Sequence, residues 1–164
     1  MNAITKNIPN SITCLNLLSG CFACLFAYKG EYDIVALCIG LSALFDFLDG
    51  MAARLLHAYS PMGKELDSLA DLISFGLVPG FMAMHFMLYD SVFHGINDSY
   101  QIWWALSALL IPVFSALRLA KFNIDARQTT SFIGLPVPAN ALFWIGICQA
   151  GLQIENKACG YAIV

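Results

Sequence analysis

Residues 46–71 read DFLDGMAARLLHAYSPMGKELDSLAD, and this stretch decides how we expect the rest of the chain to fold. It sets four aspartates and an arginine between apolar runs, in a chain that is otherwise poor in charge. Asp46 and Asp49 are three residues apart, so on a helix they share one face. Asp67 and Asp71, four apart, share a face of a second helix. The sequence therefore predicts two helices, joined by a short polar turn, that point carboxylate pairs at each other.

The composition is that of a membrane protein. Of 164 residues, 59% are hydrophobic and only 12% are charged, against about 25% charged residues in a typical soluble domain. The mean hydropathy is +0.71. The formal net charge of -3 says little by itself, and we expect no nucleic acid among the partners. Cys21 and Cys24 lie in an apolar run, so we expect buried or lipid-facing thiols there rather than a redox or metal site.

Apolar runs of membrane-spanning length define the predicted fold. Each is near the ~20 residues that a helix needs to cross a bilayer: 12–28, 34–56, 66–89, 102–122 and 135–154. Polar turns are expected at 29–33, 90–100 and 123–132. Glu155 to Lys157 should close the fifth span, and 160–164 resembles the start of a sixth that the chain does not complete. The sequence thus predicts one all-α, polytopic membrane domain over residues 1–164, truncated at its C-terminus.

The basic residues predict the orientation of the bundle, because cytoplasmic loops carry an excess of lysine and arginine. With the amino terminus inside, the cytoplasmic set is Lys6, Arg54, Lys64, Arg118, Lys121 and Arg127. Only Lys29 and Lys157 then lie outside. The aspartates are accordingly expected near the cytoplasmic ends of the second and third spans.

Four carboxylates inside spanning segments point to bound cations, because they would otherwise repel one another. Hard divalent ions such as Mg²⁺ or Mn²⁺ prefer oxygen ligands and bind through carboxylates and substrate phosphates. Two such ions balance four carboxylates and suit displacement at phosphorus. Gly50 and Ala53 lie on the same helix face as the aspartates, and their small size leaves room for a ligand. Arg54 can bind a phosphate through a bidentate contact.

Two other interpretations of the carboxylates remain open at this point. The aspartates can reach interfacial water, or pair with Arg54 and Lys64, without any catalytic role. They can also line an ion or proton path, although this leaves the arrangement of Gly50, Ala53 and Arg54 unexplained.

The complete pattern resembles the signature of the CDP-alcohol phosphotransferases. That signature is Asp-x2-Asp-Gly-x2-Ala-Arg-x8-Gly-x3-Asp-x3-Asp, and every fixed position is matched within 46–71. Pro9, Asn10 and Thr13 resemble the amino-terminal Pro-Asn-x-x-Thr element of the family. The runs LRLAKFN at 117–123 and FIGLPVPA at 132–139 resemble its phosphatidylserine synthase branch. The resemblance covers essentially the whole chain. One feature differs: the family has at least six spans, whereas this chain stops near the start of its sixth.

This resemblance implies an enzyme that converts CDP-diacylglycerol and L-serine to phosphatidylserine and CMP. It also implies a homodimer in the cell inner membrane, with two divalent cations at an active site facing the cytoplasm. Asp46, Asp49 and Asp67 would bind the metals, and Asp71 would contact one metal and act as general base. The residues expected to contact the CDP headgroup are Asn10, Thr13, Gly50, Arg54 and Ser60.

The serine site is less closely defined by the pattern. Serine brings a carboxylate, so we expect a cation at its site, and Arg118 is our candidate, with Lys121 and Asn123 assisting. Both basic residues can instead be simple topology anchors at the interface.

Two rival functions follow from the same residues. Another acceptor alcohol, glycerol phosphate or inositol phosphate, would use the same chemistry but should need a denser basic pocket. A cation transporter or channel would use the carboxylates without any phosphoryl transfer.

Overall fold

The computed structural model describes residues 3–89, 98–124 and 135–161, and it describes side chains from 7–89, 100–124 and 135–151. The α-helices in chain order are α1 (Ala3–Lys29), α2 (Tyr32–Leu55), α3 (Pro61–Asp71), α4 (Val78–Tyr89), α5 (Asp98–Leu106), α6 (Leu110–Ile124) and α7 (Val137–Tyr161). The π-helical turn η1 (Leu72–Leu77) joins α3 to α4, and the 3-10 turn η3 (Ser107–Leu109) joins α5 to α6. The described residues contain no strand, so the all-α prediction is confirmed for them.

Four helical segments are long and apolar enough to cross a membrane: Asn7–Lys29, Tyr32–Leu55, Pro61–Tyr89 and Tyr100–Ile124. They contain or closely match the first four predicted spans. The fifth predicted span falls on α7, which is not among the candidate spans found in the described part of the chain. A fifth span therefore stays a prediction.

Helix α7 does not end where we expected the fifth span to close. We expected Glu155 to Lys157 to close it, but α7 continues through them to Tyr161. Glu and Lys are good helix formers, and neither Pro nor Gly interrupts the backbone at that point. Gly160 and Tyr161, assigned to a sixth span, are the last residues of α7, and 162–164 lie outside the described residues.

The predicted turns differ from the structure at their edges. The turn between the first two spans is shorter than expected, because α2 already begins at Tyr32. Helix α5 begins at Asp98 and α6 ends at Ile124, inside stretches expected to be loops. The remainder of those loops, 90–97 and 125–132, lies outside the described residues.

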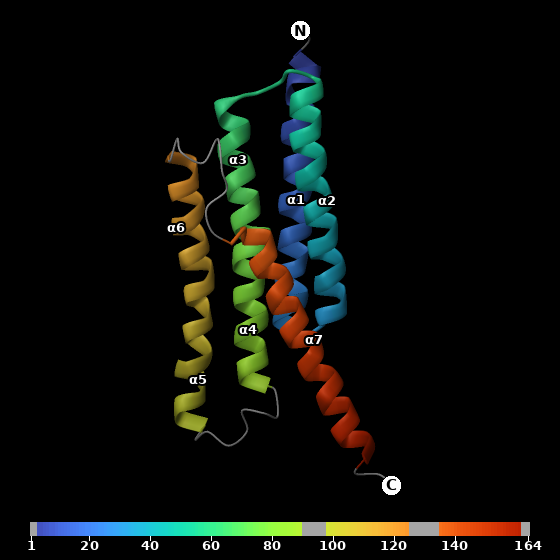
Figure 1. The fold of residues 1–164 in the computed structure, drawn as a ribbon, viewed down its shortest axis with the longest axis vertical. Helices are drawn as coiled ribbons and strands as arrows, with labels where there is room; N and C mark the ends of the chain where they lie inside the picture. Colours follow the sequence, from blue (N-terminus) through green and yellow to red (C-terminus); the bar gives the residue numbers. More distant parts are fainter. Residues whose placement is uncertain (1–2, 90–97, 125–134, 162–164) are drawn as a thin grey trace.

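The helices lie along a common axis (Figure 1). Helices α1 and α2 form an antiparallel hairpin, α3 and α4 run beside it as one continuous rod, and α5 and α6 lie on the outside. Helix α7 runs obliquely across α2, η1 and α4. The start of α1, the end of α2, the start of α3 and the end of α6 therefore meet at the same end of the bundle.

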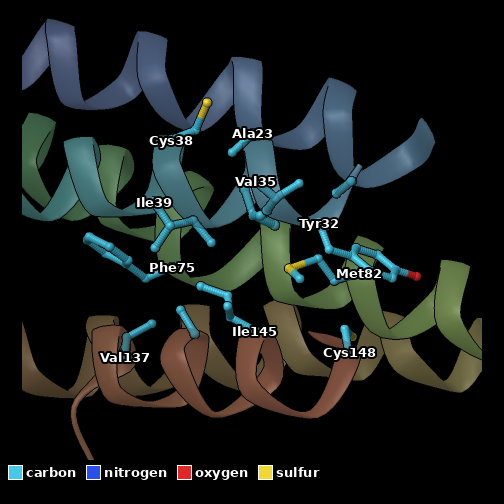
Figure 2. Packing of buried hydrophobic residues seen from close by; sticks show 13 residues of the cluster. Ala23, Tyr32, Val35, Cys38, Ile39, Phe75, Met82, Val137, Ile145 and Cys148 are labelled. Atoms are coloured by element: carbon cyan, nitrogen blue, oxygen red, sulfur yellow. The ribbon is translucent and has the colours of Figure 1, made fainter. Parts of the chain in front are cut away.

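An apolar core holds these helices together below that end. Figure 2 shows Val35 and Ile39 of α2 packed towards Phe75 of η1 and Met82 of α4, with Ile145 of α7 closing the cluster. Val35, Ile39, Phe75 and Met82 are at most 1% exposed. The core thus clamps α2 against the rod of α3, η1 and α4, and so sets the position of the aspartates.

The hairpin turn between α1 and α2 requires a glycine. Gly30 has a φ of +76°, and a Cβ there would lie 2.5 Å from Cε1 of His85 in α4. The His85 ring is itself held, because its Nδ1 is 2.9 Å from the Tyr32 hydroxyl. The ring cannot move away without losing that contact.

Gly30→Ala is therefore expected to destabilise the protein. The left-handed backbone alone costs a residue with a Cβ on the order of 1–3 kcal/mol, and the clash with His85 adds to it. Thermal unfolding in detergent measures the change. The matched control is Gly40→Ala on α2, where a Cβ would meet nothing within 4 Å and helix propensity favours alanine. Equal melting temperatures for the two variants would contradict the prediction.

Candidate active site

Three of the predicted metal ligands lie together. One carboxylate oxygen each from Asp46, Asp49 and Asp67 lies within 4.8 Å of the other two. The first two come from α2 and the third from α3, so the predicted meeting of two helix faces is present for these residues. Asp49 is only 5% exposed, and Asp46 and Asp67 are half-buried. Carboxylates this close and this sheltered from water favour a shared cation.

The start of α3 is set by a side-chain cap. Ser60 is the N-cap, and its Oγ accepts a hydrogen bond of 2.9 Å from the backbone N–H of Gly63. Pro61 occupies the first turn, where its missing N–H is harmless. From this start, the helical repeat brings Gly63, Asp67 and Asp71 onto one face. Ser60, predicted as a headgroup contact, thus also determines where the aspartates of α3 begin.

Helix α1 approaches α3 closely at Gly63. A Cβ at that position would lie 2.9 Å from Oδ1 of Asn10 and 3.0 Å from Oγ of Ser60. A side chain at that position would displace the Asn10 amide and the Ser60 hydroxyl. The predicted headgroup residues of the amino-terminal element are therefore brought against the start of α3.

Thr13 holds one of the aspartates. Its hydroxyl lies within hydrogen-bonding distance of Oδ2 of Asp49 and, at 3.0 Å, of the Pro9 carbonyl oxygen. Thr13 is 3% exposed. A hydroxyl that donates to a buried carboxylate orients it, so Thr13 supports Asp49 directly, a contact that the sequence pattern does not specify.

Asp71 is a neighbour of the other three aspartates and not a member of their group. It is not part of the three-carboxylate group, and it follows Asp67 by one helical turn, farther into the bundle. Its Oδ1 lies 3.5 Å from Nδ2 of Asn16 on α1, which donates to it. Sequence reasoning missed Asn16, since no motif position marks it. A polar residue in the middle of an apolar span was the available signal.

A pocket of about 530 Å³ opens beside the carboxylates. It is lined by Pro9, Asn10, Thr13, Asp49, Gly50, Ala53, Arg54, Ala58, Tyr59, Ser60, Pro61, Gly63, Lys64 and Asp67. All the residues expected to contact the headgroup are in this lining. A Cβ at Gly50 would meet nothing within 4 Å, so space does lie beside that backbone. Tyr59 and Lys64 line the pocket too, although we had not assigned them to it.

The residues predicted for serine do not line this pocket. Asn123 at the end of α6 donates from Nδ2 to Oγ of Ser68 at 2.8 Å, and its carbonyl oxygen accepts from Nζ of Lys64 at 3.3 Å. These bonds tie α6 to α3. Arg118 is partly buried on α6 and Lys121 is exposed. A role for these residues with serine stays a prediction.

The donor set fits a divalent cation. Oδ1 of Asp67 is buried and has no hydrogen-bond partner among the described residues. Such an atom is rare unless something else satisfies it. All the nearby candidate ligand atoms are carboxylate oxygens, the donors that Mg²⁺ and Mn²⁺ prefer. A cation between α2 and α3 would satisfy the Asp67 oxygen and offset the repulsion among the three side chains.

Comparison with known proteins finds one matching family and several relatives that share one name. The CDP-alcohol phosphatidyltransferase family matches residues 6–159. A CDP-diacylglycerol–serine O-phosphatidyltransferase of Bacillus subtilis is 40% identical over 156 residues, covering 95% of this chain and 80% of that protein. Proteins of the same name from Mycobacterium leprae and Helicobacter pylori are each 35% identical. They are matched over 89% and 91% of this chain, but over only 48% and 58% of their own lengths.

Proposed function

The chain belongs to the CDP-alcohol phosphatidyltransferase family, and we propose that it transfers the phosphatidyl group of CDP-diacylglycerol to the hydroxyl of L-serine. The products are phosphatidylserine and CMP. The observation that carries this proposal is the group of three carboxylates beside a pocket with cationic walls. The name shared by the relatives points to serine as the acceptor.

In this proposal the carboxylates hold divalent metal. Asp46, Asp49 and Asp67 would hold two divalent cations, Mg²⁺ or Mn²⁺, and Asp71 would contact one of them. Bound there, such ions neutralise the diphosphate and make its phosphorus easier to attack. The unpartnered Asp67 oxygen and the spacing of the three carboxylates support this role.

The pocket is proposed to take the CDP headgroup. The diphosphate is an anion, and Arg54 in the pocket wall offers the planar, bidentate donor that phosphate oxygens prefer. Lys64 adds a second cation to the same wall. Asn10 and Thr13 close the pocket from α1, and Gly50 leaves room for the ligand. The acyl chains then extend into the bilayer beside the helices.

The reaction is a single displacement at the lipid phosphorus. The serine hydroxyl oxygen forms a bond to the phosphorus that carries the diacylglycerol. The bond from that phosphorus to the bridging oxygen of the diphosphate breaks, and CMP leaves with the electron pair. The hydroxyl proton passes to the carboxylate of Asp71, which acts as general base. Asp71 suits this task because it lies outside the three-carboxylate group, yet only one helical turn from Asp67.

We propose that the pocket faces the cytoplasm from the cell inner membrane. Arg54, Lys64, Arg118 and Lys121 lie towards the end of the bundle where the pocket opens, and Lys29 lies at the other end. This distribution supports a cytoplasmic amino terminus. A homodimer is part of the same proposal and rests on the resemblance alone.

Lipid-product analysis tests the acceptor. The purified chain, in vesicles containing CDP-diacylglycerol and Mn²⁺, is given labelled L-serine, labelled glycerol 3-phosphate or labelled inositol phosphate in parallel. We expect labelled phosphatidylserine and equimolar CMP, both lost on chelation. Product from another alcohol alone would reject serine, and ion flux without CMP release would indicate a transporter or channel.

Replacing Arg118 or Arg54 by alanine should affect the KM values of the two substrates differently. Arg118→Ala is expected to raise KM for serine by about 10- to 100-fold, the worth of a hydrogen bond to a charged group. Its effect on KM for CDP-diacylglycerol should be small, because Arg118 does not line the pocket. Arg54→Ala is the matched comparison and should show the reverse pattern. Equal changes in both KM values for Arg118→Ala would argue against a contact with the serine carboxylate.

A further inference from the structure

Asn16 is a polar side chain buried in the middle of a membrane-spanning helix. It is 0% exposed and lies on α1, between α2 and η1. Burying an amide in such a place is costly unless each polar atom finds a partner. Both ends of this amide do: Nδ2 donates to Oδ1 of Asp71, and Oδ1 accepts a 2.8 Å hydrogen bond from the hydroxyl of Ser74.

The orientation of the amide follows from these two partners. A carboxylate only accepts hydrogen bonds, so the NH₂ group must face Asp71. The Ser74 hydroxyl then donates to the remaining oxygen. The flipped amide would place its oxygen against the Asp71 carboxylate. The Asp71 carboxylate thus selects the orientation of the Asn16 amide, and the hydrogen bond from Ser74 stabilises the amide in that orientation.

The backbone around Asn16 is equally constrained. Its carbonyl oxygen accepts from the hydroxyl of Ser42 on α2 at 3.3 Å and lies 3.3 Å from the hydroxyl of Ser74. Gly20, one turn along α1, has no side chain where a Cβ would collide with Oγ of Ser74. Three segments thus converge on one asparagine. Such a buried and interconnected network is rigid.

The π-helical turn explains how Ser74 reaches this place. Turn η1 begins directly after Asp71, at Leu72, and Ser74 lies inside it. A π-turn shifts the side chains that follow it relative to a regular α-helix, and such turns are frequent at functional sites. Ser74, three residues after Asp71, thereby faces α1, where Asn16 contacts both side chains.

From this geometry we infer that Asn16 is a positioning residue, which holds the Asp71 carboxylate in place for proton transfer from the acceptor alcohol. The inference rests on the proposed function. Its donor contacts Oδ1 of Asp71, so the other oxygen, with two lone pairs, is left for the metal contact and the incoming proton. The contact is 3.5 Å long; hydrogen bonds in catalytic sites are often long before substrate binds and tighten in the complex.

The test compares steady-state kinetics of four purified proteins: wild type, Asn16→Ala, Ser74→Ala and Ser19→Ala. Asn16→Ala is expected to lower kcat by about 10- to 100-fold, as loss of an outer partner of a site residue does. KM for CDP-diacylglycerol and for serine should change less than about threefold. Ser74→Ala, which removes the hydrogen bond to Oδ1 of Asn16 and so loosens the amide, should lower kcat by a smaller factor in the same pattern.

Ser19→Ala is the matched control. Ser19 is buried on α1, and its hydroxyl donates to the Cys38 carbonyl oxygen of α2 at 2.8 Å. The substitution removes a buried interhelical hydrogen bond without involving Asn16 or Asp71, so kcat should stay at the wild-type value. Each variant is also melted in the presence and absence of CDP-diacylglycerol with Mn²⁺, and Asn16→Ala should keep the stabilisation that these ligands give.

The outcomes separate the inference from the function on which it rests. If wild type releases no CMP with serine, the proposed function falls and the inference falls with it. With wild-type release present, an unchanged kcat in Asn16→Ala overturns the inference alone. If kcat falls as much in Ser19→Ala as in Asn16→Ala, the effect is merely structural and the inference is also overturned. Should Asn16→Ala not fold, Ser74→Ala decides, and a wild-type kcat in that variant overturns the inference.

Discussion

Asp71→Asn is expected to lower kcat by about 10²- to 10⁴-fold, the usual contribution of a general base. The amide has nearly the same shape as the carboxylate but cannot accept the hydroxyl proton. Asp71 lies outside the three-carboxylate group and does not line the pocket, so binding of CDP-diacylglycerol should change little. The rate of CMP release in the presence of serine measures kcat. Binding of labelled CDP-diacylglycerol measures the affinity for that substrate.

The control for this prediction is Asp33→Asn. Asp33 is an exposed aspartate in the first turn of α2, at the opposite end of that helix, where it accepts a 3.3 Å hydrogen bond from Gln149. The chemical change is identical but far from the pocket, so the rate should match wild type. A near-normal rate in Asp71→Asn would show that another group takes the proton.

Asp67→Asn should have the largest effect on metal dependence. Even the outer partners of metal ligands are worth about 10- to 100-fold in affinity. Loss of a ligand carboxylate should therefore raise the Mn²⁺ concentration for half-maximal rate by more than about 100-fold. The buried Asp67 oxygen that lacks a described partner is the atom whose replacement should matter most. Asp46→Asn, which removes another carboxylate of the group, should act in the same direction.

Asp67→Asn should weaken metal binding, but it should make the metal-free protein more stable. Without a cation, three sheltered carboxylates within 4.8 Å repel one another, so removing one charge should raise the melting temperature measured in chelator. Mn²⁺ should then stabilise Asp67→Asn less than wild type. A lower melting temperature in chelator, together with an unchanged rise on adding Mn²⁺, would contradict a metal role for Asp67.

The sequence alone predicted those parts of the site that depend on local spacing. Residues three or four apart share a helix face, so the pairing of Asp46 with Asp49, and of Asp67 with Asp71, followed from counting. The length of the apolar runs likewise predicted the first four membrane helices. The long motif went further and identified the family, because so many fixed positions rarely agree by chance.

What the sequence could not supply were contacts between residues far apart in the chain. Asn16 meets Asp71 and Ser74 across 55 and 58 positions, and Asn123 reaches Ser68 across 55. No local pattern marks such pairs. That Asp71 lies outside the group of three carboxylates also came only from the structure.

Local periodicity therefore determined which helices form and which face of each carries the carboxylates, since both follow from a repeat of 3.6 residues per turn. Only the tertiary structure decided how those faces meet. The apolar core packs α2 against the rod of α3, η1 and α4, and the π-turn shifts the side chains that follow Asp71. That packing gathers three aspartates, leaves the fourth to Asn16, and opens the pocket beside them.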